Sequence, residues 1–155
     1  MAQPGGASPT EPEPSGEPPL EPLITQAFGR RDLGTLRHRV AACAAEAGLV
    51  GGRLQGFVLA VNEITTNAVV HGGGLGRLRL WLSARQLVCE ITDTGPGMPG
   101  GRVPPHREPP PEALGGRGLW LTRTLCDAFS VRTGRLGTTV RLATGLPRRA
   151  CAPLV

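Results

Sequence analysis

The chain contains no lysine and no tyrosine, and only 3% of its residues are aromatic. With so few rings, the core must be built from Leu, Val, Ile and Ala, and little is left to stack on the bases of a nucleic acid. All 17 basic residues are arginines, and they are scattered rather than gathered into a basic run. The sequence therefore does not favour direct nucleic-acid binding.

Nothing in the sequence indicates insertion into a membrane or export. No apolar run approaches the ~20 residues of a membrane-spanning helix, and no apolar segment follows a basic N-terminus. The four cysteines, Cys43, Cys89, Cys126 and Cys151, lie far apart and form no C-x-x-C pair. We therefore expect a cytoplasmic protein with reduced thiols and no membrane partner.

Charge and proline divide the chain into a tail and a domain. Its 155 residues suit one domain. Residues 1–22 hold seven prolines, and the only charged residues before Arg30 are Glu11, Glu13, Glu17 and Glu21. We expect a disordered acidic tail over 1–22, a folded domain over 23–144 and a second tail over 145–155. Beyond the first tail 8 acids face 17 arginines, a net charge of +9 that favours an acidic partner, nucleotide included.

The spacing of apolar residues predicts a small α/β domain. Helical periodicity predicts helices over 33–47, 53–71 and 119–126. Alternation predicts strands over 23–28, 77–83, 87–92, 129–133 and 138–144. Two hairpins then imply a two-layer α/β sandwich, with a mixed, mainly antiparallel sheet and three helices on one face. Residues 96–116 contain seven prolines, which indicates either disorder or a functional lid.

The most informative segment is VNEITTNAVVH, residues 61–71. In a helix, Glu63 and Asn67 point the same way because they are four residues apart. A carboxylate that can accept a proton then lies beside an amide oxygen that can bind a hard cation, and phosphoryl transfer needs both. Gly56 and Ala60 precede them in the same row, as suits a surface that a ligand approaches. Alone, such a pair is more often an ordinary solvated helix face.

Three glycine-containing segments follow. Residues 93–98 (DTGPGM) place a carboxylate at a strand end, where it can accept a hydrogen bond from an amine such as adenine N6, and the glycines allow a sharp turn. Residues 115–119 (GGRGL) open a helix whose free N–H groups favour phosphate. Residues 137–139 (GTT) precede the last strand. Each has an ordinary reading as a turn, hinge or hairpin, but their order is improbable as coincidence.

In this order the four segments resemble the N, G1, G2 and G3 boxes of the histidine-kinase-like ATPase superfamily, which has the Bergerat ATP-binding fold. The resemblance covers about residues 23–143. Within the superfamily, the chain is most similar to the small anti-sigma-factor serine/threonine kinases. These carry E-x-x-x-N-A followed by a His and a Gly, as Glu63, Asn67, Ala68, His71 and Gly72 do here.

The resemblance implies ATP and Mg²⁺ as cofactors and a role for each box. Glu63 would be the general base and Asn67 the Mg²⁺ ligand. His71 is left open between a helix cap and a catalytic role. The remaining implied roles are contact with the adenine amine (Asp93), the shape of the base pocket (Gly95, Gly97, Met98), backbone offered to phosphates (Gly116, Gly118, Leu119) and support of adenine recognition (Thr138).

The activity implied by the resemblance is that of an ATP-dependent protein serine/threonine kinase whose partner is a sigma factor or an antagonist protein. The alternative is an ATP-gated binding module or an ATPase without protein kinase activity. A histidine-kinase catalytic domain usually has Asn where this chain has Glu63, and the gyrase and chaperone branches need large transducer domains. The partner's identity and the formation of a homodimer stay open.

Overall fold

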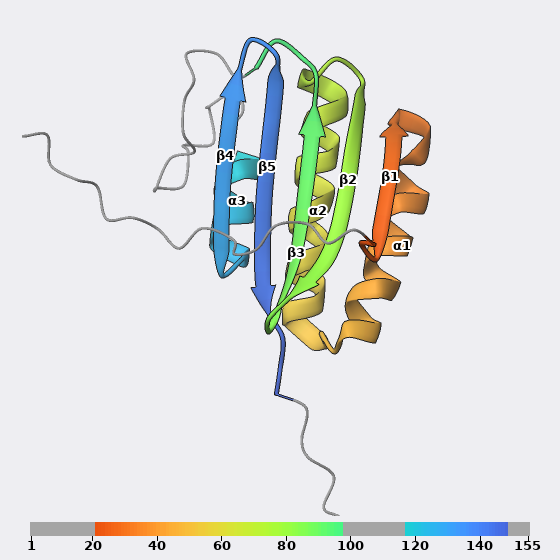
Figure 1. Ribbon diagram of the computed structural model, residues 1–155, viewed down its shortest axis with the longest axis vertical. Helices are drawn as coiled ribbons and strands as arrows, with labels where there is room; N and C mark the ends of the chain where they lie inside the picture. The colour runs from red at the N-terminus through yellow and green to blue at the C-terminus, as the bar shows by residue number, and fades with distance from the viewer. Residues whose placement is uncertain (1–20, 98–116, 149–155) are drawn as a thin grey trace, which may run out of the picture.

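The computed structural model describes residues 21–97 and 117–148, which form a two-layer α/β unit (Figure 1). Strand β1 (Ile24–Gly29) leads through a 3-10 turn, η1 (Arg30–Asp32), into helices α1 (Leu33–Ala47) and α2 (Gly51–His71). The hairpin of β2 (Leu75–Ser83) and β3 (Gln86–Asp93) follows. The last elements are α3 (Arg117–Leu125) and the hairpin of β4 (Ala128–Gly134) and β5 (Gly137–Gly145).

Every helix and strand expected from the sequence is present, and its ends differ by at most two residues from the expected ones. Only η1 was not expected. The greater part of both expected tails and of the proline-rich stretch over 96–116 lies outside the described residues.

The five strands are ordered β1-β2-β3-β5-β4. Each of the four pairings between described strands is antiparallel, so the expected sandwich with a mainly antiparallel sheet is confirmed. Because β3 pairs with β5, the end of one strand meets the start of the other, and Asp93 lies opposite Thr138. This pairing brings two motif segments that are distant in sequence to the same edge of the sheet.

All three helices cover one face of the sheet (Figure 1). The buried stripe of α1 consists of Leu36, Val40 and Ala44, as its periodicity predicts. The buried stripe of α2 packs against the residues of β2, β3 and β5 whose side chains point toward the helices. These residues alternate along each strand with residues that point to the opposite face of the sheet. These buried residues are Phe57, Val61, Ile64 and Ala68 of α2, Leu78 and Leu80 of β2, Cys89 and Ile91 of β3, and Val140 and Leu142 of β5.

Cys43, Cys89 and Cys126 are free thiols, whereas Cys151 lies outside the described residues. Burial raises the pKa of the Cys126 thiol to about 12 and raises that of Cys89 well above its ordinary value. Burial therefore favours the protonated form of both thiols at neutral pH. Among the helices of residues 21–97 and 117–148, none is long and apolar enough to cross a membrane.

Candidate functional site

Helix α2 presents Glu63 and Asn67 to the start of α3. Both side chains are half-buried, and neither has a hydrogen-bond partner within the described part of the chain. A Cβ on Gly118 would lie 2.8 Å from Glu63 Oε2 and 3.6 Å from Asn67 Nδ2. The backbone at the start of α3 therefore lies directly against both polar groups, and a side chain on Gly118 would have to displace the Glu63 carboxylate.

The first half of this helix row is not a ligand surface. Gly56 and Ala60 are buried, and a Cβ on Gly56 would contact Leu125 Cδ2 at 3.4 Å. The Thr122 hydroxyl reaches the carbonyl of Ala60 at 3.5 Å. The expectation that these two small residues face a ligand is wrong, because α3 packs on them. Small residues at the contact allow the helix axes to approach, and this packing places the start of α3 beside Glu63.

Asp93 ends β3 at the junction of three elements. Its Oδ1 accepts hydrogen bonds from the backbone N–H of Gly95 (3.0 Å) and of Thr138 (3.3 Å). Its Oδ2 lies beside Gly72, at the end of α2, 2.6 Å from where a Cβ on that glycine would be. Two backbone donors thus orient the carboxylate through one oxygen, and within the described residues Oδ2 has no such donor.

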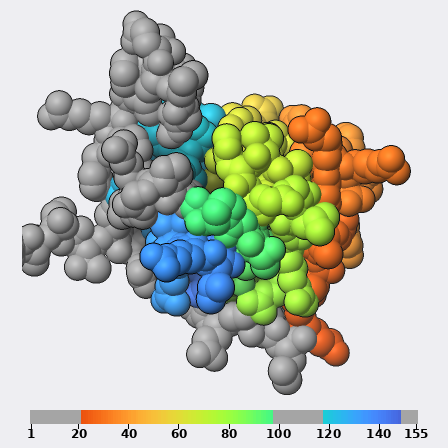
Figure 2. Space-filling model, turned by 90° about the horizontal axis from the view of Figure 1, so that it is seen from above, coloured from red at the N-terminus to blue at the C-terminus, as the bar shows by residue number. Residues whose placement is uncertain are grey.

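Glycines hold the turn after Asp93 between its neighbours. A Cβ on Gly95 would lie 2.6 Å from the carbonyl carbon of Gly72. Gly97 has φ +82° and lies against the carbonyl oxygen of Gly134, where no side chain would fit. Figure 2 looks onto this end of the molecule, where the end of β3, the β4–β5 turn and the α2–β2 connection adjoin. Gly95 and Gly97, which were expected to shape the base pocket, allow the backbone after Asp93 to lie directly against Gly72 and Gly134.

Two residues of this edge, Thr133 and Gly134, were not singled out from the sequence. Thr138 is only 6% exposed, and its hydroxyl shares a hydrogen bond with that of Thr133 at 3.0 Å. Gly134 supplies the carbonyl that lies beside Gly97. The signal that could have found them is the register of the expected hairpin, which places Thr133 opposite Thr138.

The remaining expected site residues are Met98, Gly116 and Leu119, together with His71, whose role was left open. Met98 and Gly116 lie outside the described residues. Leu119 is half-buried and packs on the main core, so only its backbone is left for a ligand. His71 is exposed as the last residue of α2, where a cation is favoured by the helix dipole.

The Asp93 carboxylate and the pair Glu63 and Asn67 lie at different heights along α2. Between Glu63 and Gly72, α2 rises ~13 Å. The carboxylate of Asp93, beside Gly72, thus lies ~13 Å along the helix from Glu63 and ~7 Å from Asn67. A base held at Asp93 and phosphates held at Asn67 and the start of α3 would belong to the same molecule.

Residues 29–144 match the histidine kinase-like ATPase domain. The chain belongs to this family. Membership in this ATPase family implies that the chain binds ATP, and the residues described above fit a nucleotide by their chemistry. A search of proteins with curated annotation returns no match for the chain.

Two solved structures share the fold of this histidine kinase-like ATPase domain. The histidine kinase domain of the blue-light activated histidine kinase EL346 from Erythrobacter litoralis is 22% identical, with a TM-score of 0.50 and coverage of 74% of this chain and 65% of that chain. The RsbU and RsbW domains of Rv1364c from Mycobacterium tuberculosis are 19% identical, with a TM-score of 0.55 and coverage of 82% and 34% respectively. The match thus spans less than two thirds of either structure, and at these identities the likeness concerns the fold alone.

Proposed function

We propose that the chain is an ATP-dependent protein serine/threonine kinase of the anti-sigma-factor type, which phosphorylates a protein antagonist or sequesters a sigma factor. The observation that carries the proposal is the placement of Glu63 one helical turn before Asn67, with both side chains against Gly118 at the start of α3. This arrangement combines a proton acceptor, a cation ligand and a helix N-terminus at one point. An RsbW domain among the solved structures of this fold agrees with the proposal.

The residues present suit a nucleotide and a hard cation. ATP would supply the phosphoryl group that is transferred. Asp93, oriented through Oδ1, would accept a hydrogen bond from the base amine on Oδ2. Asn67 carries an amide oxygen of the kind that Mg²⁺ accepts as a ligand. The first N–H groups of α3 have no partner within the helix and lie at the positive end of its dipole, so they favour phosphate.

In this proposal Glu63 is the general base. Its carboxylate would accept the proton of a serine or threonine hydroxyl, and a positioned base contributes typically ~10²–10⁴-fold to the rate. The hydroxyl must come from another protein that docks beside α2 and α3. The proposal therefore requires a protein partner, and it predicts slow turnover without one.

A second candidate is an ATP-gated binding module, or an ATPase without protein kinase activity. The observation that favours it is that no described residue donates a hydrogen bond to Glu63 and so fixes its orientation. A base is usually held by a further group. In the kinase, that group would be supplied by the docked partner.

The decisive experiment is capture of partner proteins by the full chain with Mg²⁺ and ATP, followed by mass spectrometry for new phosphoserine and phosphothreonine. The parent should capture and phosphorylate a partner, whereas Glu63→Gln should capture the same partner without phosphorylating it. Glu46→Gln, an exposed acid on α1, is the matched control and should behave as the parent. Capture by the parent without any new phosphosite would support the binding module instead.

A further inference from the structure

The face of the sheet opposite the helices carries an apolar row. The strand register aligns Trp81 of β2, Val88 of β3, Ala143 of β5 and Ala128 of β4. Leu23, immediately before β1, continues the row, because the next residue, Ile24, pairs with Leu80. We call these five residues the open-face row. The four strand residues form an apolar cluster separate from the main core.

The four strand residues of the open-face row are buried, and Leu23 at its end is 45% exposed, although no helix or strand within residues 21–97 and 117–148 lies over the row. Figure 1 looks onto this face, with α1, α2 and α3 behind the sheet. Trp81 is nevertheless only 1% exposed, and Val88 and Ala143 are fully buried. The indole N–H of Trp81 is also buried, without a hydrogen-bond partner. A large ring on an uncovered sheet face would be exposed, so its burial requires a cover.

The same face is basic beside this row. In the adjacent row Glu90 lies between Arg79 and Arg141, and the Arg141 Nη2 to Glu90 Oε2 distance is 2.7 Å. Arg141 also lies over the Trp81 ring, 5.4 Å from its centroid. One carboxylate between two guanidinium groups leaves an excess of positive charge.

A third row increases this charge. It carries Arg77 and Arg132, which are both exposed. A hollow of about 440 Å³ lies where these two rows meet the edge of the sheet; it is lined by Arg77, Arg79, Glu90 and Thr92 of the rows and by Leu75, Gly76, Asp93 and Thr94 of the edge. The face thus offers an aromatic ring and apolar row on one side and exposed arginines on the other.

We propose that the N-terminal segment, residues 1–20, lies across this face, with its prolines over Trp81 and its glutamates beside the arginines. The segment holds six prolines and three glutamates, Glu11, Glu13 and Glu17, and no basic residue. Proline-rich segments dock on aromatic-lined grooves at low entropic cost, because their extended conformation is preformed. The acids complement a face whose exposed charges are arginines.

Chain geometry supports the same occupant. The segment joins the domain just before Leu23, which is the first residue of the open-face row. Strands lie ~4.8 Å apart, so crossing the row from β1 to β4 spans ~19 Å. A polyproline segment advances ~3.1 Å per residue and needs about six residues for this distance. The 20 residues before Glu21 are therefore more than sufficient, and their glutamates fall within reach of the arginine rows.

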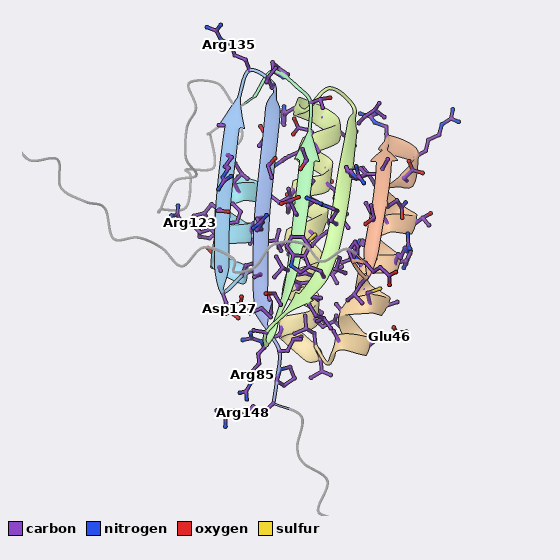
Figure 3. All side chains as sticks on the ribbon, viewed as in Figure 1. Glu46, Arg85, Arg123, Asp127, Arg135 and Arg148 are labelled. Carbon is purple, nitrogen blue, oxygen red and sulfur yellow. The ribbon has the colours of Figure 1, made fainter. Side chains whose placement is uncertain are left out.

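Quenching of Trp81 fluorescence by acrylamide tests the proposal on the full-length chain. The chain has two tryptophans, so Trp120→Phe leaves Trp81 as the only reporter. Combined Glu11→Arg, Glu13→Arg and Glu17→Arg should weaken docking about tenfold, since three surface ion pairs are lost. The expected result is stronger quenching and red-shifted emission, with an unchanged far-UV dichroism spectrum. Glu46→Arg on α1, far from this face, is the control and should change neither (Figure 3).

A charge exchange identifies the segment's contact. Arg77→Glu with Arg132→Glu should restore shielding of Trp81 in the protein with the reversed tail, whereas Arg37→Glu, exposed on α1, should not. Equal shielding of Trp81 in the parent, in the reversed tail and in a chain whose residues 2–20 are replaced by Gly and Ser would overturn the proposal. A shielded Trp81 in a reversed-tail protein that sediments as a dimer would likewise overturn it, and would assign the face to a second copy.

Discussion

Gly118 lies against Glu63 so closely that a Cβ on the glycine would be 2.8 Å from the carboxylate oxygen Oε2. The contact joins the start of α3 to the residue proposed as general base. It is set by the packing of α3 on Gly56 and Ala60 earlier in α2. The position of Glu63 therefore depends on the fit of two helices as well as on its own rotamer.

Gly118→Ala tests this contact. The added methyl group must displace the end of a flexible side chain, so we expect a change in stability below about 1 kcal/mol. Displacement of the base by about 1 Å should slow phosphoryl transfer by up to ~10²-fold. Gly34→Ala is the control, because its Cβ meets no atom within 4 Å. It should stabilise α1 by up to about 1 kcal/mol and leave the rate unchanged. Chemical denaturation measures the stability of each variant, and a phosphotransfer assay measures its rate. A Gly118→Ala variant that transfers phosphate as fast as the parent would show that the contact does not position Glu63.

The helices were predictable because burial on one face imposes a 3.6-residue period that can be read from the sequence. Leu36, Val40 and Ala44 of α1 follow this period and are buried. The order of the four motif segments likewise predicted the family. Periodicity cannot show what packs on a row, however. Gly56 and Ala60 were assigned to a ligand surface because their actual neighbour, α3, begins about sixty residues later in the chain.

Alternation along β2 shows a similar limit. It separates Leu78, Leu80 and Leu82 from Arg77, Arg79 and Trp81, and the two sets do face opposite sides. Yet Leu82 is 47% exposed and Trp81 is 1% exposed. Leu82 lies toward the end of its strand, and Trp81 adjoins small residues of β3 and β5 in a separate cluster. Which positions a sheet buries thus depends on what covers them and on pairing with strands distant in the sequence, such as β5 against β3, and alternation along one strand shows neither.

Asp93→Asn should lower the preference for adenine over guanine nucleotides. The N–H groups of Gly95 and Thr138 both require an oxygen at the δ1 position, so the new amide nitrogen must occupy the δ2 position beside Gly72. A donor would then face the base amine. Loss of a charged hydrogen bond costs about 1.5–3 kcal/mol, at least about tenfold in affinity. Calorimetric titration with ATP and GTP measures the change, and a parent protein that binds both equally would remove Asp93 from base recognition.

Asn67→Ala tests whether Asn67 binds Mg²⁺, independently of the contact between Asp93 and the adenine base. If Asn67 holds Mg²⁺ against the phosphates, the variant should lose most of the gain in ATP affinity that Mg²⁺ gives the parent. Without ligand, the free energy of unfolding of the variant should lie within about 0.5 kcal/mol of that of the parent, because the Asn67 side chain is half-buried and makes no hydrogen bond among the described residues. Titration of both proteins with ATP, with and without Mg²⁺, gives the comparison. A parent whose affinity does not depend on Mg²⁺ would contradict the assignment.

The ion pairs of Glu90 with Arg79 and Arg141 should make the protein less stable in acid. Burial alone would raise the pKa of Glu90, but hydrogen bonds from Arg141 and Arg79 outweigh burial and hold it below its ordinary value of 4.5. Since the folded pKa lies below the unfolded one, the stabilisation is complete above about pH 4.5 and is lost as the pH falls through the lowered value. Glu90→Gln should cost about 1.5–3 kcal/mol at pH 7.

Urea unfolding between pH 7 and pH 3 tests this linkage. The stability gap between parent and Glu90→Gln should narrow below about pH 4.5, because the parent alone loses the ion pairs there. Glu46→Gln, with an exposed side chain, serves as the control and should follow the parent throughout. A gap that stays constant to pH 3 would mean that the two arginines do not stabilise the ionised carboxylate.

Glu63→Gln separates the kinase from the ATPase, because a general base acts on the rate and contributes little to ground-state binding. The variant should bind ATP within about twofold of the parent, yet lose ~10²–10⁴-fold in phosphoryl transfer. In a protein kinase, the parent alone should hydrolyse ATP very slowly, since no hydroxyl reaches Glu63 until a partner docks. Stopped-flow measurements give the ATP affinity, and a steady-state assay gives the rate of hydrolysis. Each is made with and without the captured partner. Rapid hydrolysis without a partner that disappears in Glu63→Gln would establish an ATPase, and transfer to a partner that persists in the variant would deny Glu63 the role of base.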